Sequence, residues 1–342
     1  RLLAVSYTGG VYSENFDSLG TTGTTLPTDW QVLDLPGGTG DVTSGTFPVS
    51  RVGTATASTP ALLGWNFEQT GNASISGVAN GGQSNTDPDR CLVTAPTGVA
   101  GKGLHLTVNN GTGASIAGFR ITFDVKSWGS NAEELPGLQF FYRVSGQSNY
   151  SAVTGLNIGG PGNAADGFAL NVALNAGSNV YFRWIDDNGS GSPDRNNGLD
   201  NLTIQAIQSL TWNTTDGNWN SSAANWSGGT SFGSYDLATF SSADGGTVTV
   251  DAAGVLPSST TVSSTAGAYT LTGGAIGGKL IKSNNGGLVL QAANNFSSAS
   301  LSGTGPVEVQ ASGALGTGPV TIGTQTLVVN SASGDVSLGN AM

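Results

Sequence analysis

The residues best suited to chemistry lie in one acidic loop between Ile185 and Leu199, which strand-like sequence flanks on both sides. The loop contains several glycines and no large apolar residue. Oxygen-bearing side chains recur along it at short intervals, namely Asp186, Asp187, Asn188, Ser190, Asp194, Asn196 and Asn197, with Asp200 directly after Leu199. Hard oxygen ligands at such spacing, with glycines that permit tight turns, are what Ca²⁺ requires. The sequence therefore predicts a Ca²⁺ site that includes Asp186, Asp187, Asp194 and Asp200.

The predicted Ca²⁺ would have a structural role, because it would hold the loop and both flanking strands together. A solvated turn rich in Asp and Asn is the alternative interpretation, since such a turn needs no metal. The crowding of four carboxylates with only Arg195 to offset them favours the metal. The spacing differs from the EF-hand template, which requires a bidentate Glu at its last position. Both interpretations stay open.

Catalytic groups are scarce, and we predict that the protein is not an enzyme. His105 is the only histidine, and it stands between Leu104 and Leu106 in an alternating strand. It should therefore face away from both leucines, at the surface or at the edge of a sandwich. No nucleophile-elbow motif accompanies it. Glu133 and Glu134 are adjacent in a loop, whereas a glycosidase needs two carboxylates across a cleft.

Aromatic side chains are the remaining candidates for ligand binding, because a sugar ring can stack on an exposed Trp or Tyr. The candidates are Trp65, Trp128, Tyr142 and Tyr150. Each has a structural alternative, since large aromatic residues are mostly buried. The sequence alone does not decide between a ligand-stacking role and a core role for any of them.

Composition excludes several classes of partner. The chain of 342 residues has 22 acidic and 11 basic residues, and its net charge of -11 disfavours nucleic acid and anionic membranes. Cys91 is the only cysteine, so no intramolecular disulfide and no thiolate zinc cluster can form, and we expect it to be a small buried hydrophobic residue. The sequence has no apolar run of about 18 residues, so we expect no membrane span.

The first part of the chain, residues 1–207, has the pattern of an antiparallel β-sandwich. Apolar residues alternate with polar ones in successive segments, separated by turns rich in Gly, Asn and Ser, and helical periodicity is absent. The clearest predicted strands are 103–109, 118–126, 138–144, 168–172, 179–185 and 199–206, with earlier ones at 3–7 and 11–16. Sequential strands of this kind indicate an all-β domain, and we predict a jelly roll.

Several motifs in this part resemble a jelly-roll domain of bacterial secreted surface proteins. They are E-N-F-D-S-L-G (residues 14–20), L-P-T-D-W (26–30), D-R-C-L (89–92) and the closing D-N-G-S-G…N-G-L-D-N-L-T-I. The outline is also similar to calcium-bearing carbohydrate-binding modules. In those modules an acidic residue near the first strand and an Asp at the last strand share one ion. That resemblance implies Glu14 and Asp200 as the corresponding ligands.

The second part, residues 208–342, differs in composition and has only six acidic residues and two lysines. Short apolar and β-branched runs recur about every ten residues between Gly, Ser, Asn and Thr. Regular short strands indicate a solenoid, whose turns bury a core only by stacking on each other. Trp212, Trp219 and Trp226 precede these runs, and we expect them to cap the first turn. The pattern continues to the last residue, so we expect the natural protein to be longer.

The segment G-L-V-L-Q-A-A-N-N-F-S-S-A-S-L-S-G-T-G-P-V-E-V-Q-A-S-G-A-L-G-T-G-P-V-T-I (287–322) resembles the autotransporter-associated β-strand repeat. The W-N…D-G-N-W-N…A-N-W segment resembles the sequence that commonly precedes such repeats. The resemblance implies a short right-handed parallel β-helix in a bacterial surface or secreted protein, and it implies no activity. The residues present do not indicate export by an autotransporter route.

We therefore expect an extracellular or cell-surface structural protein, which forms a homo-oligomer or polymer such as a fibre or layer. Exposed strand edges invite such contacts, and the run from Leu2 to Tyr7 could add to the sheet of a neighbouring subunit. The alternative is a carbohydrate-binding or adhesive module whose partner is an extracellular polysaccharide. The third hypothesis is a polysaccharide lyase or hydrolase, which would need basic and acidic residues clustered on one face of the solenoid. Lys279, Lys282 and Glu308 are too sparse for that.

Overall fold

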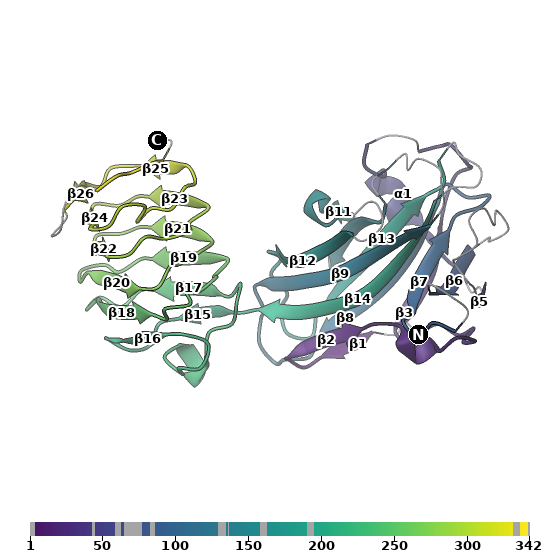
Figure 1. Cartoon of the computed structure of the whole chain (residues 1–342), viewed down its shortest axis with the longest axis horizontal. Helices are drawn as coiled ribbons and strands as arrows, with labels where there is room; N and C mark the ends of the chain where they lie inside the picture. The colour runs from purple at the N-terminus through teal and green to yellow at the C-terminus, as the bar shows by residue number, and fades with distance from the viewer. Residues whose placement is uncertain are drawn as a thin grey trace. The chain divides into compact units, whose positions relative to one another are not determined.

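The computed structural model describes residues 4–42, 45–58, 63–64, 77–82, 86–128, 135, 137–157, 163–189, 195–330 and 336–340. The chain forms two compact units, Arg1–Ala206 and Ile207–Met342 (Figure 1). Both units are built almost entirely of β-strands, as the alternating sequence predicts. No helix among these residues is long and apolar enough to span a membrane.

The first unit is a sandwich of two seven-stranded sheets. One sheet has the order β11-β10-β13-β8-β3-β4, with β1 beside β8, and the other has the order β12-β9-β14-β7-β6-β5, with β2 beside β14. The strands are β1 (Val5–Tyr7), β2 (Val11–Glu14), β3 (Trp30–Leu35), β4 (Thr56–Ser58), β5 (Leu63–Gly64), β6 (Gly77–Gly81), β7 (Cys91–Ala95), β8 (Gly101–Asn110), β9 (Gly118–Trp128), β10 (Gln139–Val144), β11 (Ser151–Ala152), β12 (Asn163–Leu170), β13 (Asn179–Asp187) and β14 (Asn196–Ile207).

The pairing of β7 to β14 is that of a jelly roll. One sheet contains β12, β9, β14 and β7 in that order, and the other contains β11, β10, β13 and β8. The chain therefore crosses between the sheets at nearly every connection, which is the double Greek-key arrangement of eight strands. The predicted jelly-roll sandwich is confirmed.

Aromatic side chains fill the space between the two sheets. Val180, Phe182 and Trp184 alternate along β13 and point inward, because successive side chains of a strand face opposite sides. The Trp184 ring lies 5.2 Å from that of Phe140 and 5.5 Å from that of Trp30, measured between ring centroids. The Phe140–Trp184 pair is edge-to-face, and such pairs add to the hydrophobic gain of burial. Cys91 is buried in a separate small cluster with Ala79 and Val93, as expected.

The first strand belongs to its own sandwich. β1 pairs in parallel with β8, and the Tyr7 hydroxyl accepts a hydrogen bond from Ala206 N and donates one to Gly10 O. The hypothesis that the run from Leu2 to Tyr7 adds to a neighbouring subunit is therefore wrong for the described part of that run, Val5–Tyr7. On one side its backbone groups are already paired with β8 of the same chain.

A segment between β3 and β4 covers part of the outer face of the first sheet. It includes the short helix α1 (Val49–Thr54), which the sequence pattern did not predict. Phe47 and Val52 from this segment pack with Leu35, Phe141 and Ile185 in a second apolar cluster. The outer face of this sheet is therefore partly a core rather than a solvated surface.

The second unit is a parallel β-solenoid, which agrees with the predicted β-helix. Two six-stranded parallel sheets run along it, with the orders β15-β17-β19-β21-β23-β25 and β16-β18-β20-β22-β24-β26. The strands are β15 (Ser209–Thr211), β16 (Gly217–Trp219), β17 (Leu237–Phe240), β18 (Gly246–Val250), β19 (Ser259–Val262), β20 (Tyr269–Gly273), β21 (Lys279–Lys282), β22 (Leu288–Leu290), β23 (Ser298–Leu301), β24 (Val307–Val309), β25 (Val320–Ile322) and β26 (Leu327–Val329).

Neighbouring turns of the solenoid are joined by buried polar side chains as well as by strand pairing. Asn294 Oδ1 accepts a hydrogen bond from Ile276 N at 2.9 Å, and Asn294 Nδ2 donates one to Ala314 O at 2.9 Å. One asparagine therefore links three successive turns.

Lys282 is also buried, and its Nζ donates to the carbonyl oxygens of Ser283 and Asn284. It therefore does not contribute to an exposed active face.

Three tryptophans close the first turn, as predicted. Trp226 packs against Trp212 and Trp219 with ring centroids 5.1 and 5.4 Å apart, and Phe232 and Phe240 join the same cluster. Trp226 also forms backbone bridges with Trp212 and Thr230, so the segment after β16 folds back over the first turn. The terminal turn of a solenoid needs such a cover, because its inner face has no neighbour on one side.

We predict that Trp219→Ala destabilises the solenoid by about 3–5 kcal/mol, because Trp219 is fully buried and its loss leaves a large cavity. Asn218→Ala is the matched control, since Asn218 is exposed on the same strand and should change stability by less than about 0.5 kcal/mol. Urea unfolding followed by hydrogen exchange of peptides from residues 209–330 measures the effect. Equal stability of the two variants would contradict the capping role.

Candidate functional site

Asp186 from the predicted Ca²⁺ set lies between the two sheets of the sandwich. Its Oδ2 accepts a hydrogen bond from Thr94 Oγ1 at 2.5 Å, and its Oδ1 accepts one from Asn197 Nδ2 at 2.8 Å. Ser127 Oγ in turn donates to Asn197 Oδ1 at 2.6 Å. The buried carboxylate thus ties β13 of one sheet to β7 and β14 of the other. Its oxygens are engaged in holding the sandwich together.

The residues that follow Asp186 continue into the covered end of the sandwich. Asp187 is buried and pairs in register with Gly101 of β8. Asn188 Nδ2 donates to Val99 O at 2.6 Å and to Thr39 Oγ1 at 3.1 Å. Asp194 lies outside the described residues.

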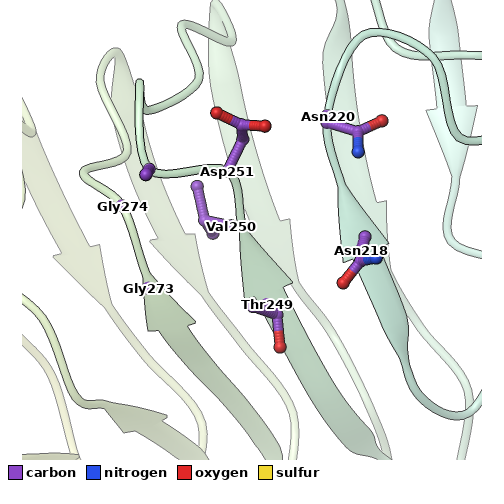
Figure 2. Close-up of a pocket in the computed structure, with 8 residues that line it drawn as sticks. Asn218, Asn220, Thr249, Val250, Asp251, Gly273 and Gly274 are labelled. Atoms are coloured by element: carbon purple, nitrogen blue, oxygen red, sulfur yellow. The ribbon is translucent and has the colours of Figure 1, made fainter.

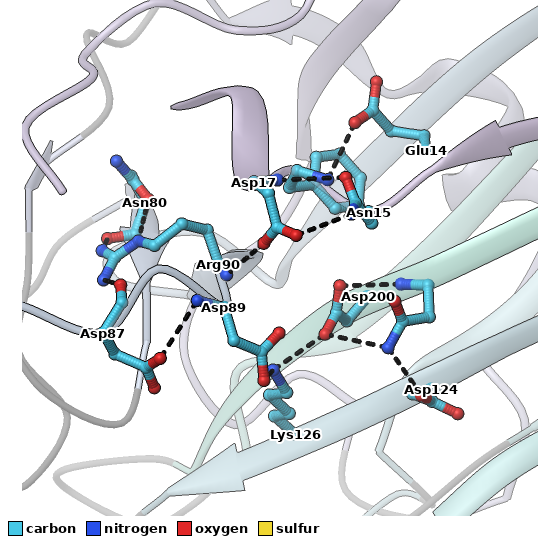
Figure 3. Close-up of polar contacts among 12 residues, drawn as sticks. Glu14, Asn15, Asp17, Asn80, Asp87, Asp89, Arg90, Asp124, Lys126 and Asp200 are labelled. Atoms are coloured by element: carbon cyan, nitrogen blue, oxygen red, sulfur yellow. Dashed lines mark hydrogen bonds and ion pairs between the residues drawn. The ribbon is translucent and has the colours of Figure 1, made fainter. Parts of the chain in front are cut away.

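Asp200 forms a buried ion pair on the outer face of the other sheet (Figure 3). Lys126 Nζ lies 2.8 Å from Asp200 Oδ2 and 2.8 Å from Asp89 Oδ2. Asn201 N donates to Asp200 Oδ1 at 2.7 Å, and Asn201 adopts a left-handed conformation with φ of 50°. This local irregularity in β14 directs the Asp200 carboxylate to the lysine on β9.

Burial decides the protonation balance of this pair. Because Asp200 is fully buried, desolvation raises its pKa to about 6, and the hydrogen bond and charge of Lys126 oppose that rise. Burial lowers the pKa of Lys126, but its hydrogen bonds to Asp200 and Asp89 outweigh burial and raise it overall. Lys126 and Asp200 therefore form a structural ion pair. The Asp200 carboxylate begins to gain a proton when the pH falls to about 6.

Glu14 does not join Asp200 at a shared point. Its Oε1 accepts a hydrogen bond from Phe16 N at 2.8 Å, and burial raises its pKa. In Figure 3 its carboxylate lies apart from the Asp200–Lys126 pair. The described residues contain no group of three or more His, Cys, Asp or Glu side chains arranged to hold a metal. The described members of the predicted Ca²⁺ set therefore lie at separate places in the sandwich, and Ca²⁺ binding stays a prediction.

Sequence reasoning missed a second polar network, centred on the fully buried Arg90 (Figure 3). Arg90 Nε donates to Asn80 Oδ1 at 2.8 Å, and Arg90 N donates to Asp17 Oδ1 at 2.8 Å. Asn80 Nδ2 continues the network to Gly20 O at 2.8 Å. Asp17 belongs to the E-N-F-D-S-L-G motif and Arg90 to the D-R-C-L motif. The two motifs are therefore joined by a hydrogen bond, and Arg90 fixes their relative positions.

The predicted sugar-stacking residues do not form an exposed platform in the described part of the chain. Tyr142 on β10 is half-buried and packs against the main core of the sandwich. Tyr150 is 5% exposed. Trp65 lies outside the described residues, and so does the side chain of Trp128 at the end of β9.

The expected surface position of His105 is wrong. Its side chain faces away from Leu104 and Leu106, as predicted, but it is 4% exposed. Its Nδ1 accepts a hydrogen bond from Arg183 Nε at 3.4 Å, and its ring stacks on Tyr181. Sequence alternation could assign the face of the sheet but not the side chains that cover it.

A groove with a volume of about 550 Å³ lies beside the first turns of the solenoid (Figure 2). Its lining residues are Asn218, Asn220, Thr249, Val250, Asp251, Ala252, Gly273 and Gly274. A Cβ atom at Gly274 would lie 1.8 Å from Asp251 O, so the close stacking of these turns requires glycine there. The groove offers amide, hydroxyl and carboxylate groups for hydrogen bonds to a polar ligand. It has one carboxylate, whereas glycoside hydrolysis uses two.

Comparison with protein-family models found no match, and comparison with curated proteins found no similar sequence. The resemblance to autotransporter-associated repeats therefore depends on the quoted residues. The parallel solenoid that it implied is present, while secretion and surface location remain proposals.

We predict that the sandwich loses stability as the pH falls through the range in which an unfolded histidine gains its proton. Burial, with the nearby Arg183 and Arg143 charges, lowers the pKa of His105 to about 3 in the folded state. The unfolded state therefore binds more protons below pH 6.5. The His105 contribution is fully present above that pH, and about 2 kcal/mol of it is lost by pH 5.

His105→Gln keeps a side chain that can accept from Arg183 and removes the titration. The difference in unfolding free energy between wild type and this variant should therefore change by about 2 kcal/mol between pH 7 and pH 5. Urea unfolding at each pH measures it. A constant difference across that range would show that His105 titrates normally in the folded protein.

Proposed function

We propose that this chain is part of an extracellular structural protein of a bacterial surface, which self-assembles into a fibre or layer. The observation that carries the proposal is the way in which the solenoid uses its polar side chains. Asn294 joins three successive turns, and Lys282 is bound by backbone carbonyl oxygens inside the unit. Asn294 thus stabilises the stacking of turns, and Lys282 is held inside its own turn instead of being presented on the surface.

The architecture supports a load-bearing or spacing role. In a solenoid each turn contacts only its neighbours, so stability grows with each added interface and the unit is stiff along its axis. The buried ion pair and the Asp186 bridge give the sandwich comparable internal cohesion. Location outside the cell is supported by the resemblance of residues 287–322 to a repeat of bacterial surface and secreted proteins.

Assembly would use the free edge of the sandwich. β12 is the last strand of its sheet and pairs with β9 on one side only, within the part of the chain that the structure describes. An edge strand of this length presents backbone N–H and C=O groups to a strand of another molecule. This edge replaces the run from Leu2 to Tyr7 as the proposed assembly surface.

We predict that the purified chain forms ordered fibres or layers in negative-stain micrographs, and that Ala169→Glu in β12 suppresses them. A charge on an edge strand disfavours strand addition, and Ala169 lies opposite Arg120, which can accommodate the carboxylate. Thr203→Glu on the central strand β14 is the matched control and should still assemble. A monomer at all concentrations, or equal assembly by both variants, would contradict the proposal.

A carbohydrate-binding or adhesive role is the second candidate, and the groove beside the first solenoid turns is the observation that favours it. Its polar lining suits the hydroxyl groups of a neutral sugar. Retention of the wild type on a neutral polysaccharide, with release of Asn220→Ala, would favour this function over a purely structural one.

Ca²⁺ binding by the acidic loop stays a prediction, and its test is thermodynamic. A ligand that binds only the folded state stabilises it by about 2.7 kcal/mol at roughly 100 times its dissociation constant. We expect millimolar Ca²⁺ to stabilise the sandwich relative to EDTA, and Asp187→Asn to remove the effect. Asp200→Asn should retain it, because Lys126 already holds that carboxylate. Identical unfolding in Ca²⁺ and EDTA would contradict Ca²⁺ binding.

A further inference from the structure

Two arginines and three aromatic rings meet on the outer face of the sheet that contains β8, β13 and β10. Arg143, Tyr150, Tyr181, Arg183 and His105 form this group, the arginine–tyrosine cluster. Tyr181 pairs in register with Arg143 of β10, and Arg183 pairs with His105 of β8. Side chains opposite each other on neighbouring strands point to the same face of a sheet. The fold therefore brings the cluster together from three strands and the segment before β11.

The aromatic rings hold both guanidinium groups in place. Arg143 Cζ lies 4.6 Å from the Tyr181 ring centroid and 5.3 Å from that of Tyr150, and Arg183 Cζ lies 4.3 Å from that of Tyr150. Contacts of this kind are attractive, and more so when the cation is partly removed from water. The two arginines are half-buried, so both keep some access to solvent.

Neither arginine has an acidic partner among the described residues. The ion pairs between described residues use Arg51, Lys102 and Lys126 instead. A guanidinium has five N–H donors. Arg143 donates to Gln147 O, and Arg183 donates to His105 Nδ1 and Val52 O. Most of the donors of this pair therefore have no acceptor in the described part of the protein.

One of these guanidinium donors, Arg143 Nε, is buried without a hydrogen-bond partner among the described residues. Burial raises the pKa of the Tyr150 hydroxyl, and the neighbouring Arg183 and Arg143 groups oppose that rise. A buried polar group without a partner costs free energy. Burial and the neighbouring Arg143 charge also lower the pKa of Arg183, although Tyr150 opposes this. The cluster therefore has two mutually repelling cations and a buried donor, which an anion would satisfy.

We propose that the arginine–tyrosine cluster binds a carboxylate or sulfate group carried by an acidic polysaccharide. The forked guanidinium matches the geometry of such oxyanions and binds them with paired hydrogen bonds. The anion chemistry follows from the cluster itself, and the polysaccharide as its source rests on the proposed extracellular location. The net charge of -11 does not prevent binding, because charges beyond about 8 Å are screened at physiological salt.

His105 acts as a positioning residue in this cluster. Its Nδ1 accepts a hydrogen bond from Arg183, so that nitrogen carries no proton. Its Nε2 lies 3.1 Å from Thr107 Oγ1, which fixes the ring from the other side. A neutral imidazole held in this way orients the Arg183 fork without adding a charge that would repel it.

The test measures binding of the whole chain to dextran sulfate, polygalacturonate, neutral dextran and inorganic sulfate by calorimetry at low and physiological salt. It is done at concentrations where the chain is monomeric, so that it is independent of assembly. Arg143→Gln removes one guanidinium group, and Arg143→Lys keeps the positive charge but lacks the paired N–H donors of a guanidinium. Arg51→Gln is the matched control, because it removes one positive charge that is already paired with Asp41. Thermal unfolding confirms that each variant is folded.

We expect binding to at least one acidic polymer and none to neutral dextran, with a loss of about tenfold or more in Arg143→Gln and no comparable loss in Arg51→Gln. Arg143→Lys should fall between wild type and Arg143→Gln, and it replaces that variant if Arg143→Gln does not fold. No binding to either acidic polymer, binding to inorganic sulfate alone, or equal loss in the Arg143 and Arg51 variants would overturn the proposal. Failure of assembly with retained polymer binding would contradict the proposed structural function only.

Discussion

Hydrogen bonding between neighbouring extended strands is the constraint on which both units depend. A strand satisfies its backbone groups only through its neighbours, so each unit must place every strand beside another. The sandwich does this with strands that are distant in sequence, such as β1 and β8. The solenoid does it with the same segment of the next turn. Buried polar side chains such as Asp186 and Asn294 help to keep these pairings in register.

Buried polar side chains act at the places where strand pairing alone leaves a gap. Asp186 joins the two sheets of the sandwich, whose described strands pair within each sheet and not with the other. Asn294 does the same between turns of the solenoid, where the connecting segments are not regular strands. A buried polar group is tolerated only when its hydrogen bonds are made, so these residues fix one arrangement of their neighbours. The arginine–tyrosine cluster differs from Asp186 and Asn294, because most of its guanidinium N–H donors have no acceptor among the described residues.

The sequence was sufficient to predict the fold class, because alternation and regular spacing depend on local pattern. The strands from Gly118 to Trp128 and from Asn179 to Asp187 show that alternation clearly. It could not predict partners that come from far along the chain. The burial of His105 depends on side chains of β13, and the Lys126 partner of Asp200 lies on another strand. An acidic residue has the same appearance in a sequence whether it binds a metal or an ammonium group.

The central claim is that buried polar side chains hold neighbouring turns together, and hydrogen exchange of Asn294→Ala tests it most directly. Asn294 contacts the backbone at Ile276 and Ala314, so its loss should speed amide exchange in the turns on both sides. Asn295→Ala is the control, because Asn295 is exposed in the same segment. The account predicts faster exchange around residues 276 and 314 in the first variant only. Exchange that rises only at residue 294 itself, or equally in both variants, would contradict it.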